Sequence, residues 1–522
     1  MTDELLRREF LLAVGGIPTL AGSAAAELSQ GPAVVPAAGK GRFWERIAAG
    51  TPLFIRDRAR KDMVFPFTPA AAASKRLDEL KDAGIDLVEV YAPAHGGNSF
   101  LGLDTIDRYK VDPRAGTMDD FKRLVDLAHR KGMWIISIDN FGYASVDAID
   151  FLKACDDVRA GRDSREARSF VWSESADAPP PGIRGDRYFM VRPTHLPGGG
   201  PGGLYDSSKH EFWQWSERAS RFYWTKWDGV DLAGKKVRLP QFNWGSPELV
   251  DEMEKVVRFW MDTGIDGIMI DAVNWYVGCD WGKNRRAMTD AIASYGDKYC
   301  QPEGAGAFRD DPVSWITEGR WTCIQDYGLG IYWEKGSNVV TNAIESGDPR
   351  PIERALRDYH DRVVDVGGTL YYNPPRFEDP RKTHLATALV AALGDLMVMA
   401  AVIDGLWSPV FPDEEQSRLL KLKTRHEALH ALGRRQALPV AAPDRHYAFL
   451  KVAADGGERL LVVLNFRPEE EAVQVDLSGV DFTEVTDLET GARVERATPW
   501  RFMVPPYGYR FLGLADRRGR VA

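Results

Sequence analysis

The stretch PELVDEMEKVVRFWMDTGIDGIMIDAV (residues 247–273) contains the structural unit that repeats along this chain. Its first part spaces apolar residues three and four apart, as an amphipathic helix does, and ends at Gly264, whereas its second part is a short apolar run typical of a buried strand. The same unit occurs earlier as AAASKRLDELKDAG with IDLVEVYAP (71–93) and as DDFKRLVDLAHRKG with MWIISID (119–139). The extent of this alternation predicts a parallel sheet closed into a TIM (β/α)8 barrel. Further strands are expected at VSWITEG (313–319), GTLYYN (368–373) and DLMVMAA (395–401).

The alternation occupies residues 41–435 and is interrupted by a Gly-, Pro- and Trp-rich segment at 141–238. We expect this segment to be a loop-rich subdomain inserted after the third barrel strand, on the side of the barrel where active sites form. Residues 436–522 change to short strands such as HYAFLKVAA and ERLLVVLNF. They predict a C-terminal antiparallel β-sandwich domain.

The first 26 residues resemble a twin-arginine export signal. They combine Arg7 and Arg8 with a modest apolar run and end in small residues at 24–26, where we expect cleavage. A Pro- and Ala-rich linker, residues 27–40, follows. Export by this route would place the folded protein in the periplasm or outside the cell, and its four cysteines need not form disulfides. The alternative interpretation is an ordinary amphipathic start.

Composition restricts the class of partner. A formal net charge of -9 disfavours nucleic acid, because phosphate binding needs a basic surface. The 16 Trp, 17 Tyr and 23 Phe have flat faces that suit sugar rings, although most of them are expected in the core. Beyond the signal, no apolar stretch is long enough to span a membrane. No cysteine spacing or Asp-rich loop indicates a metal ion, no cofactor is expected, and the oligomeric state stays open.

Three acids, Asp139, Asp271 and Glu318, follow predicted barrel strands. Because the carboxyl ends of the strands converge on one mouth of a barrel, we expect these acids to lie close together. Retaining glycoside hydrolysis needs two carboxylates there, one to attack the anomeric carbon and one to protonate the leaving oxygen. Taken singly, an acid at a strand end is more often a helix cap or a salt-bridge partner.

In order and spacing, the segments GIDLVEVYAP, GLDTIDRYKVDPRAG, GMWIISID and QFNWGSPELV with GIDGIMIDAV resemble the α-amylase family of glycoside hydrolases. The likeness is greatest to its α-glucosidase and oligo-glucosidase branch and covers nearly the whole chain after the signal. The resemblance implies that Asp271 is the nucleophile and Glu318 the general acid/base. It also implies that Asp104 lies beside the substrate, that Asp139 is mostly structural, and that Asn373 opens the seventh-strand motif.

The sequence departs from the family where the family holds its sugar. The arginine two residues before the nucleophile is Met269 here, and an aromatic residue of the family is Leu103. The Asn-His pair after the third strand is missing, and Pro374 and Pro375 replace the His-Asp expected after Asn373. The acids that make and break bonds are therefore present, but most groups that grip a glucose ring are not, a loss worth several kcal/mol.

The methionine bears on the ionisation of Asp271. A thioether cannot stabilise a carboxylate as an arginine does, so the pKa of Asp271 should exceed that in the family unless another cation compensates. Arg320 and Arg376 are candidates for that cation, with surface ion pairs as the alternative. Arg376 is also a substrate-binding candidate, together with Trp275. Glu378 or Asp379 are candidates to replace the third acid of the family's site, which is lost with the His-Asp pair after Asn373. Trp275 and Tyr276 are candidates for stacking on a sugar, and the alternative for both is a place in the barrel cap.

These features favour an exported retaining glycoside hydrolase or transglycosylase of the α-amylase type. Its substrate would be an α-linked oligosaccharide or glycoside with an atypical sugar, oxidised, deoxygenated or otherwise modified, in the cleavage subsite. A different class remains open, a catalytically inactive protein that binds carbohydrate on the same barrel. A third hypothesis, an isomerase or lyase acting on a sugar, has no positive sign in the sequence.

Overall fold

The computed structural model describes residues 42–55, 67, 70–99, 102–176, 178, 213–273, 276–278, 284–304, 311–330, 338–403, 406–495 and 497–515. The predicted export signal and linker and the substrate-binding candidate Trp275 lie outside the described residues. Within the described part of the chain, no helix is both long and apolar enough to cross a membrane.

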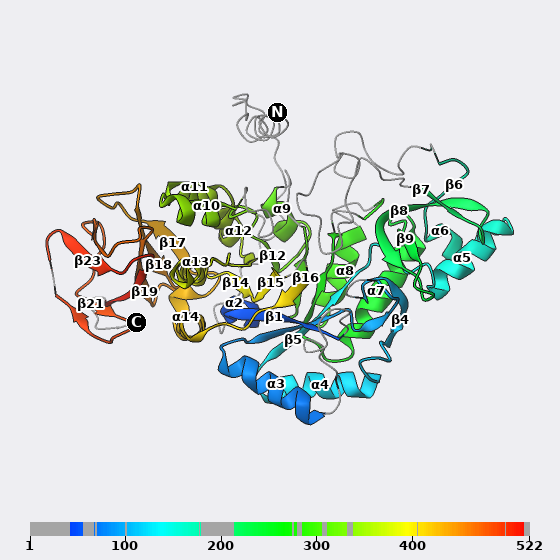
Figure 1. Ribbon diagram of the computed structural model, residues 1–522, viewed down its shortest axis with the longest axis horizontal. Coiled ribbons are helices and arrows are strands. Elements are labelled where there is room, and N and C mark those ends of the chain that lie inside the picture. Colours follow the sequence, from blue (N-terminus) through cyan, green and yellow to red (C-terminus); the bar gives the residue numbers. More distant parts are fainter. Residues whose placement is uncertain are drawn as a thin grey trace. The chain divides into compact units, whose positions relative to one another are not determined.

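An eight-stranded parallel sheet forms the centre of the unit that begins at residue 41 (Figure 1). Its strand order is β11-β10-β5-β2-β1-β14-β13-β12. The two outer strands meet where Thr322 N donates a backbone hydrogen bond of 3.2 Å to Cys300 O, so the sheet is a nearly closed, TIM-like barrel, as predicted. The strands are β1 (Ala49–Phe54), β2 (Leu87–Tyr91), β5 (Trp134–Asp139), β10 (Gly267–Ile270), β11 (Tyr299–Pro302), β12 (Cys323–Gln325), β13 (Thr369–Tyr372) and β14 (Leu396–Val398).

Alternate residues of each strand face the inside and the outside of the barrel. In β10, Ile268 and Ile270 pack in the same core cluster as Val257 of the preceding helix. Met269 instead packs in a second cluster that contains Leu87, Ile136, Tyr371 and Val398. Only the interior of the barrel brings residues of so many strands together, so Met269 faces inward. Because side chains alternate along a strand, the residue two positions after Met269 also faces inward.

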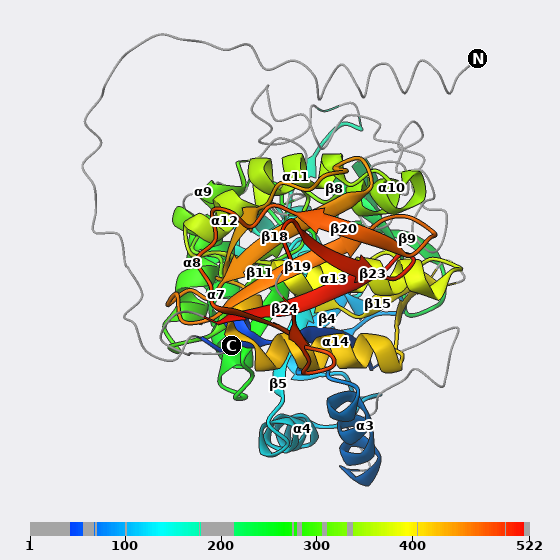
Figure 2. The ribbon, with the colours of Figure 1, turned by 90° about the vertical axis from the view of Figure 1, so that its left-hand side faces the viewer.

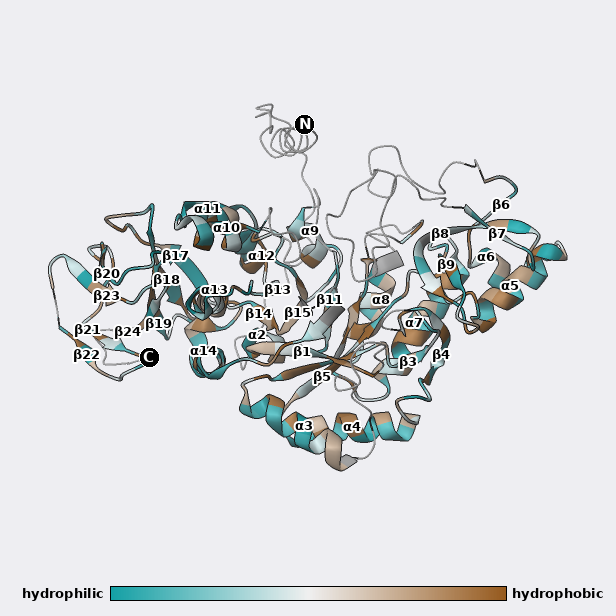
Figure 3. Cartoon of the chain, viewed as in Figure 1, coloured by the Kyte–Doolittle hydropathy of each residue, from teal (hydrophilic) through white to brown (hydrophobic). Residues whose placement is uncertain are grey.

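The helices that flank the strands bury one side on them, and Figure 3 shows the hydrophilic outer sides of α3 and α4 and the hydrophobic strand β5. In α7, Ser246 caps the start by accepting a hydrogen bond from Leu249 N, and Pro247 occupies the first turn. The predicted helices and strands around residues 71–93, 119–139 and 247–270 are confirmed. The helices are α2 (Phe43–Arg46), α3 (Ala70–Asp82), α4 (Met118–Arg130), α7 (Pro247–Met261), α8 (Asn284–Ala293), α9 (Pro312–Thr317), α10 (Val339–Ser346), α11 (Arg350–Ala355), a π-helical turn η6 (Leu356–His360), α12 (Asp361–Asp365), α13 (Pro380–Leu393) and α14 (Glu414–Arg425).

One predicted strand is wrong. The run VSWIT belongs to helix α9, with Pro312 in its first turn, and β12 begins only at Cys323. A short apolar run fits a buried helix as well as a strand, and proline at the start of the run favours the helix.

Between β5 and α7 the chain leaves the barrel. Two short helices, α5 (Ile149–Arg159) and α6 (Arg165–Arg168), precede an antiparallel sheet in which β6 (Trp172–Ser173) and β7 (Trp213–Ser216) flank β8 (Arg221–Val230). The strand β9 (Lys236–Pro240) pairs with β8 and returns the chain toward the barrel. The excursion thus falls after the third barrel strand, and the part of it that the structure describes contains two helices and four strands.

The C-terminal region consists of two antiparallel sheets, one of six strands and one of two. In β19, Leu461 and Val463 pack toward the two-stranded sheet in one apolar cluster, whereas Leu460, Val462 and Leu464 join the same cluster as the barrel helices. Figure 2 shows these strands in front of α13 and α14. The strands are β17 (Arg434–Ala437), β18 (His446–Val452), β19 (Arg459–Asn465), β24 (Tyr509–Ala515), β21 (Glu484–Asp487) and β22 (Arg493–Val494), and separately β20 (Glu471–Val475) with β23 (Trp500–Val504).

Candidate active site

Two acids from neighbouring strands meet at the mouth of the barrel. Asp271 directly follows β10, and Glu303 directly follows β11, which pairs with β10 in parallel. Asp271 stands two residues beyond the inward-facing Met269, and Glu303 stands two residues beyond Gln301, which pairs with Met269. Both side chains therefore point into the mouth of the barrel. Their carboxyl groups share a hydrogen bond. The structure therefore places a carboxylate pair here, but its second member is Glu303 rather than Glu318.

The backbone around the pair holds it in place. Ala272, directly after Asp271, has a left-handed backbone with φ of 50°, which is strained for a residue with a side chain. This conformation lets its N–H donate a 3.1 Å hydrogen bond to Glu303 Oε2, and Glu303 N donates to Ile270 O at 2.8 Å. Asp271 N donates to Asp139 O at 2.9 Å. The local strain is thus used to fix the acids relative to each other.

Burial and the neighbouring Glu303 carboxylate raise the pKa of Asp271 well above its ordinary value. None of the described residues supplies a cation that opposes this rise. This rise has the direction expected from Met269, which stands two residues before Asp271 in place of an arginine.

The wall beside the pair is apolar. Met269 and Leu103 belong to one buried cluster, together with Tyr143 from the loop after β5 and Leu239 of β9. Leu103 and Met269 stand where the sequence comparison with the family expected an aromatic ring and an arginine, and Tyr143 stands in the region of its Asn-His pair. Groups that would hydrogen-bond to ring hydroxyls are thus replaced by side chains that pack on one another.

Tyr276 supports Asp271 from behind. Its buried hydroxyl donates to Asp271 O at 2.9 Å and accepts from Phe141 N at 3.1 Å, and its ring stacks on Trp244. The proposed stacking of Tyr276 on a sugar is wrong, because its ring is inside the protein. A place in the barrel cap, the alternative interpretation, is the correct one.

Glu318 is not at the mouth. It is exposed at the end of α9, after which the chain enters the start of β12. The neighbouring Gly319 accepts a hydrogen bond from Thr289 of α8, which fixes this end of α9 among the outer helices. A helix after a barrel strand runs back toward the strand starts, so Glu318 lies at the opposite end of the barrel from Asp271.

Two predicted substrate-binding residues, Asp104 and Asn373, bond to the backbone. Asp104 is only 1% exposed and accepts a 3.1 Å hydrogen bond from Ser99 N, so its carboxylate holds the turn before β4 (Thr105–Val111), which pairs with β3 (Ala94–Gly96). Asn373 is buried after β13, and its amide donates to Val398 O at 2.8 Å. Asn373 thereby ties β13 to β14.

The remaining candidates for compensation are at the surface or in helix caps. Arg320 pairs with Asp290 at 2.8 Å, on the same side as Glu318, and therefore does not replace the lost arginine. Arg376 and Glu378 are exposed in the loop after β13.

Asp379 caps α13 and pairs with Arg381, which holds the pKa of Asp379 below its ordinary value. Asp139, expected to be structural, accepts from Ser137 Oγ at 2.6 Å, and burial raises its pKa to about 6.

Glu303 was missed because its strand carries little apolar signal. The strand β11 reads YCQP, and its inward Gln301 suits only the interior of a closed barrel. The signal for Glu303 in the sequence is the acid of QPEG, which directly follows the short strand after β10.

Comparison with known proteins identifies the domains of the chain. The family model described as alpha amylase, catalytic domain, matches residues 72–303, a range that includes Asp271 and ends at Glu303, and the model described as maltogenic amylase, C-terminal domain, matches residues 436–511. The trehalose synthase/amylase TreS of Mycolicibacterium smegmatis is 29% identical over 204 residues, which are 38% of this chain and 28% of that protein. The probable oligo-1,6-glucosidase 2 of Bacillus subtilis is 25% identical over 199 residues, or 38% of this chain and 30% of that protein. The chain thus matches less than a third of the length of these relatives.

Solved structures share the fold. The trehalose-6-phosphate hydrolase of Bacillus licheniformis superposes with a TM-score of 0.64 at 16% identity, covering 91% of this chain and 100% of that one. Amy13B of Eubacterium rectale gives 0.66 at 15% identity, covering 91% and 96%. With its barrel, its C-terminal sheets and both domain matches, the chain belongs to the α-amylase family of glycoside hydrolases.

Proposed function

We propose that the protein is a retaining glycoside hydrolase or transglycosylase that acts on α-linked glycosides. The observation that carries the proposal is the hydrogen-bonded pair of Asp271 and Glu303 at adjacent strand ends. Carboxyl groups this close fit the retaining mechanism, whereas inverting enzymes keep theirs roughly 6.5–9.5 Å apart to admit a water molecule. The names of the relatives, which include trehalose synthase/amylase and oligo-1,6-glucosidase, support an α-glycosidic linkage.

The two acids divide the chemistry. Asp271, as carboxylate, attacks the anomeric carbon, and Glu303 gives its proton to the departing glycosidic oxygen. The covalent glycosyl-Asp271 ester then reacts with water, or with another sugar hydroxyl in transfer, while Glu303 takes the proton back.

We further propose that the sugar in the cleavage subsite is atypical. The proposal is supported by Met269 and Leu103, which replace the family's arginine and aromatic ring and are buried with Tyr143 in one apolar cluster. A deoxygenated or otherwise less polar ring would lose less hydration against this cluster than glucose does. The alternative, a carbohydrate-binding protein without catalysis, is favoured by the same loss of gripping groups. Export through a twin-arginine route is part of the proposal and is supported by Arg7 and Arg8.

The test is trapping of the covalent intermediate. The protein is incubated with activated fluoro-sugar α-glycosides of glucose, of 6-deoxyglucose and of oxidised sugars, and its intact mass is measured. We expect an adduct with at least one sugar, located on Asp271 by peptide mapping. Saturable sugar binding without any adduct or product would favour the inactive carbohydrate-binding protein.

Matched variants assign the acid. Glu303→Gln should lower turnover of a glycoside with a poor leaving group by about 10²–10⁴-fold and affect an activated aryl glycoside less, because proton donation matters only for a poor leaving group. Glu318→Gln, an exposed control, should leave both rates unchanged. The reverse pattern would return the acid/base role to Glu318.

A further inference from the structure

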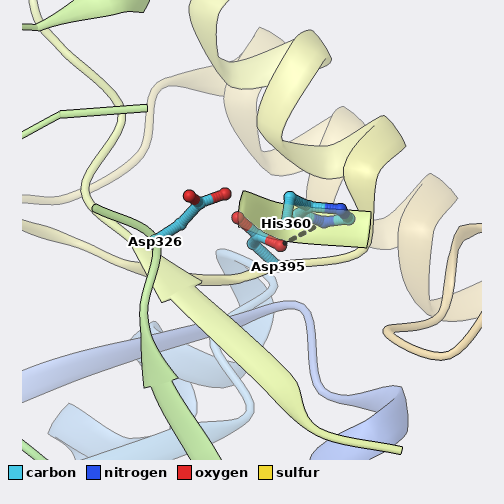
Figure 4. Close-up of side chains that lie close together, drawn as sticks. All are labelled: Asp326, His360 and Asp395. Carbon is cyan, nitrogen blue, oxygen red and sulfur yellow. Dashed lines mark hydrogen bonds and ion pairs between the residues drawn. The ribbon is translucent and has the colours of Figure 1, made fainter. Parts of the chain in front are cut away.

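A second polar cluster lies outside the barrel mouth, between the barrel wall and the helices. Asp326 follows β12, His360 ends the π-helical turn η6, and Asp395 precedes β14 (Figure 4). In β12, Cys323 faces the inside of the barrel, so Asp326, three positions later, faces outward. In β14, Leu396 faces inward, so Asp395, one position earlier, also faces outward. This cluster shares no residue with the Asp271–Glu303 pair.

The three side chains converge. One ligand-type atom of each, two carboxylate oxygens and an imidazole nitrogen, lies within 4.8 Å of the others. His360 Nε2 is 3.1 Å from Asp395 Oδ1. All three residues are at most 1% exposed. Figure 4 shows the carboxylate of Asp326 beside that of Asp395, on the side away from His360.

The cluster has unfilled capacity for bonding. Oδ2 of Asp326 and Oδ2 of Asp395 are both buried, and neither has a hydrogen-bond partner among the described residues. A buried carboxylate oxygen without a partner costs free energy, and two adjacent carboxylates repel each other. Burial, followed by repulsion from Asp395, raises the pKa of Asp326 to about 8.

Neighbouring cations do not bond to these oxygens. The ammonium group of Lys423 donates to the backbone oxygens of Ile47 and Asp395, and that of Lys451 donates to those of Leu393 and Gly433. The guanidinium of Arg435 is bound by Glu353 and Asp361. Asp361 also lies 3.2 Å from the second imidazole nitrogen, His360 Nδ1.

We propose that Asp326, His360 and Asp395 bind a divalent transition-metal ion of the zinc class. One imidazole nitrogen and two carboxylate oxygens form a ligand set that zinc accepts, and the carboxylate of Asp361 on the opposite imidazole nitrogen is the outer partner that metal-bound histidines usually have. A 3.1 Å separation between Nε2 and Oδ1 also fits two ligands of one ion. The metal would replace the proton on Nε2 and bond to Oδ1 of Asp395 and to a carboxylate oxygen of Asp326.

The proposed ion has a structural role. It would join the ends of two barrel strands to η6, and through Asp361 and Arg435 to the first strand of the C-terminal sheet. Its loss should therefore appear in stability, and the test does not depend on any glycosidase activity.

The test measures metal content and thermal stability of the full chain. The protein is expressed in minimal medium with Zn²⁺ and, separately, in chelator-treated medium, and metal is measured by mass spectrometry. We expect about one Zn²⁺ per chain from the first culture and a lower Tm for protein from the second. Cobalt grown into the protein should give visible absorption bands of a bound Co²⁺.

The variant Asp326→Asn separates the two explanations of the cluster. If a metal is bound, the substitution removes a ligand, and both the metal and several degrees of Tm are lost. If the cluster holds no cation, the same substitution removes carboxylate repulsion, and Tm stays or rises. The exposed neighbour Asp358→Asn is the control and should keep both metal and Tm. Zinc-free wild-type protein from zinc-supplemented medium, or Asp326→Asn protein of unchanged or raised Tm, would overturn the proposal.

Discussion

At the scale of single residues, Met269 explains why the acid pair is unusual. An arginine at this inward position would attract the Asp271 carboxylate and keep it ionised. The thioether instead packs in an apolar cluster with Leu103, and burial and the neighbouring Glu303 raise the pKa of Asp271. Methionine at this position thus leaves the carboxyl group of Asp271 without a nearby cation among the described residues and places an apolar side chain two residues before it.

A second inward residue gives a prediction for stability. Glu89 of β2 is fully buried inside the barrel, and its Oε1 has no hydrogen-bond partner among the described residues. Burial raises its pKa from 4.5 to about 8. The folded protein therefore binds this proton more tightly than the unfolded chain. Tighter binding of the Glu89 proton stabilises the folded protein. This stabilisation is fully present below pH 4.5 and is lost as the pH rises to about 8.

We expect Glu89→Gln to remove this loss, because glutamine is neutral at every pH. The variant should resemble the wild type at pH 4 and exceed its free energy of unfolding at pH 8 by on the order of 4 kcal/mol. Urea unfolding at several pH values measures the difference. A constant difference between pH 4 and pH 8 would show that Glu89 does not titrate in this range.

At the scale of elements, the contact between β10 and β11 sets the geometry of the acid pair. The two strands pair with Gly267 opposite Tyr299. A Cβ at Gly267 would lie 2.1 Å from the backbone oxygen of Tyr299, a contact that only a shift of β11 could relieve. Glycine at this position therefore lets the strands that carry Asp271 and Glu303 approach each other.

We predict that Gly267→Ala lowers stability by about 1–3 kcal/mol and turnover by about 100-fold, because it separates the two acids. Gly479→Ala is the control, since Gly479 has no atom within 4 Å of an added Cβ. Tm and kcat on an accepted glycoside measure the two effects. Wild-type turnover in a folded Gly267→Ala protein would mean that the strand spacing is not critical.

Local sequence predicts those elements that carry a strong apolar pattern. The strands β2, β5 and β10 and the helices α3, α4 and α7 follow from periodicity, and Asp271 follows from its place after β10. The short strands β11 and β12 do not, because their inward residues Gln301 and Gln325 are polar and make sense only inside a closed barrel. For this reason the sequence pattern predicts Glu318, and not Glu303, as the second acid.

At the scale of the whole described unit, a buried ionic network links the barrel to the C-terminal sheets. Arg435 of β17 has a side chain that is 3% exposed, and it bonds to Glu353 of α11 and Asp361 of α12, each at 2.5 Å. Tyr447 of β18 donates to the same Glu353 carboxylate. The barrel helices and the first two strands of the C-terminal sheet therefore share one set of charges.

Arg435→Met should lower the free energy of unfolding by about 3 kcal/mol, because two carboxylates lose the buried cation that compensates them. Methionine keeps most of the apolar stem, so the loss reports charge rather than packing. The neighbouring Arg434 is exposed on the same strand, and Arg434→Met should leave stability within about 0.5 kcal/mol of the wild type. Urea unfolding followed by tryptophan fluorescence measures both variants. If Arg435→Met is as stable as Arg434→Met, the apolar contacts between β19 and the barrel helices hold the two parts together without this network.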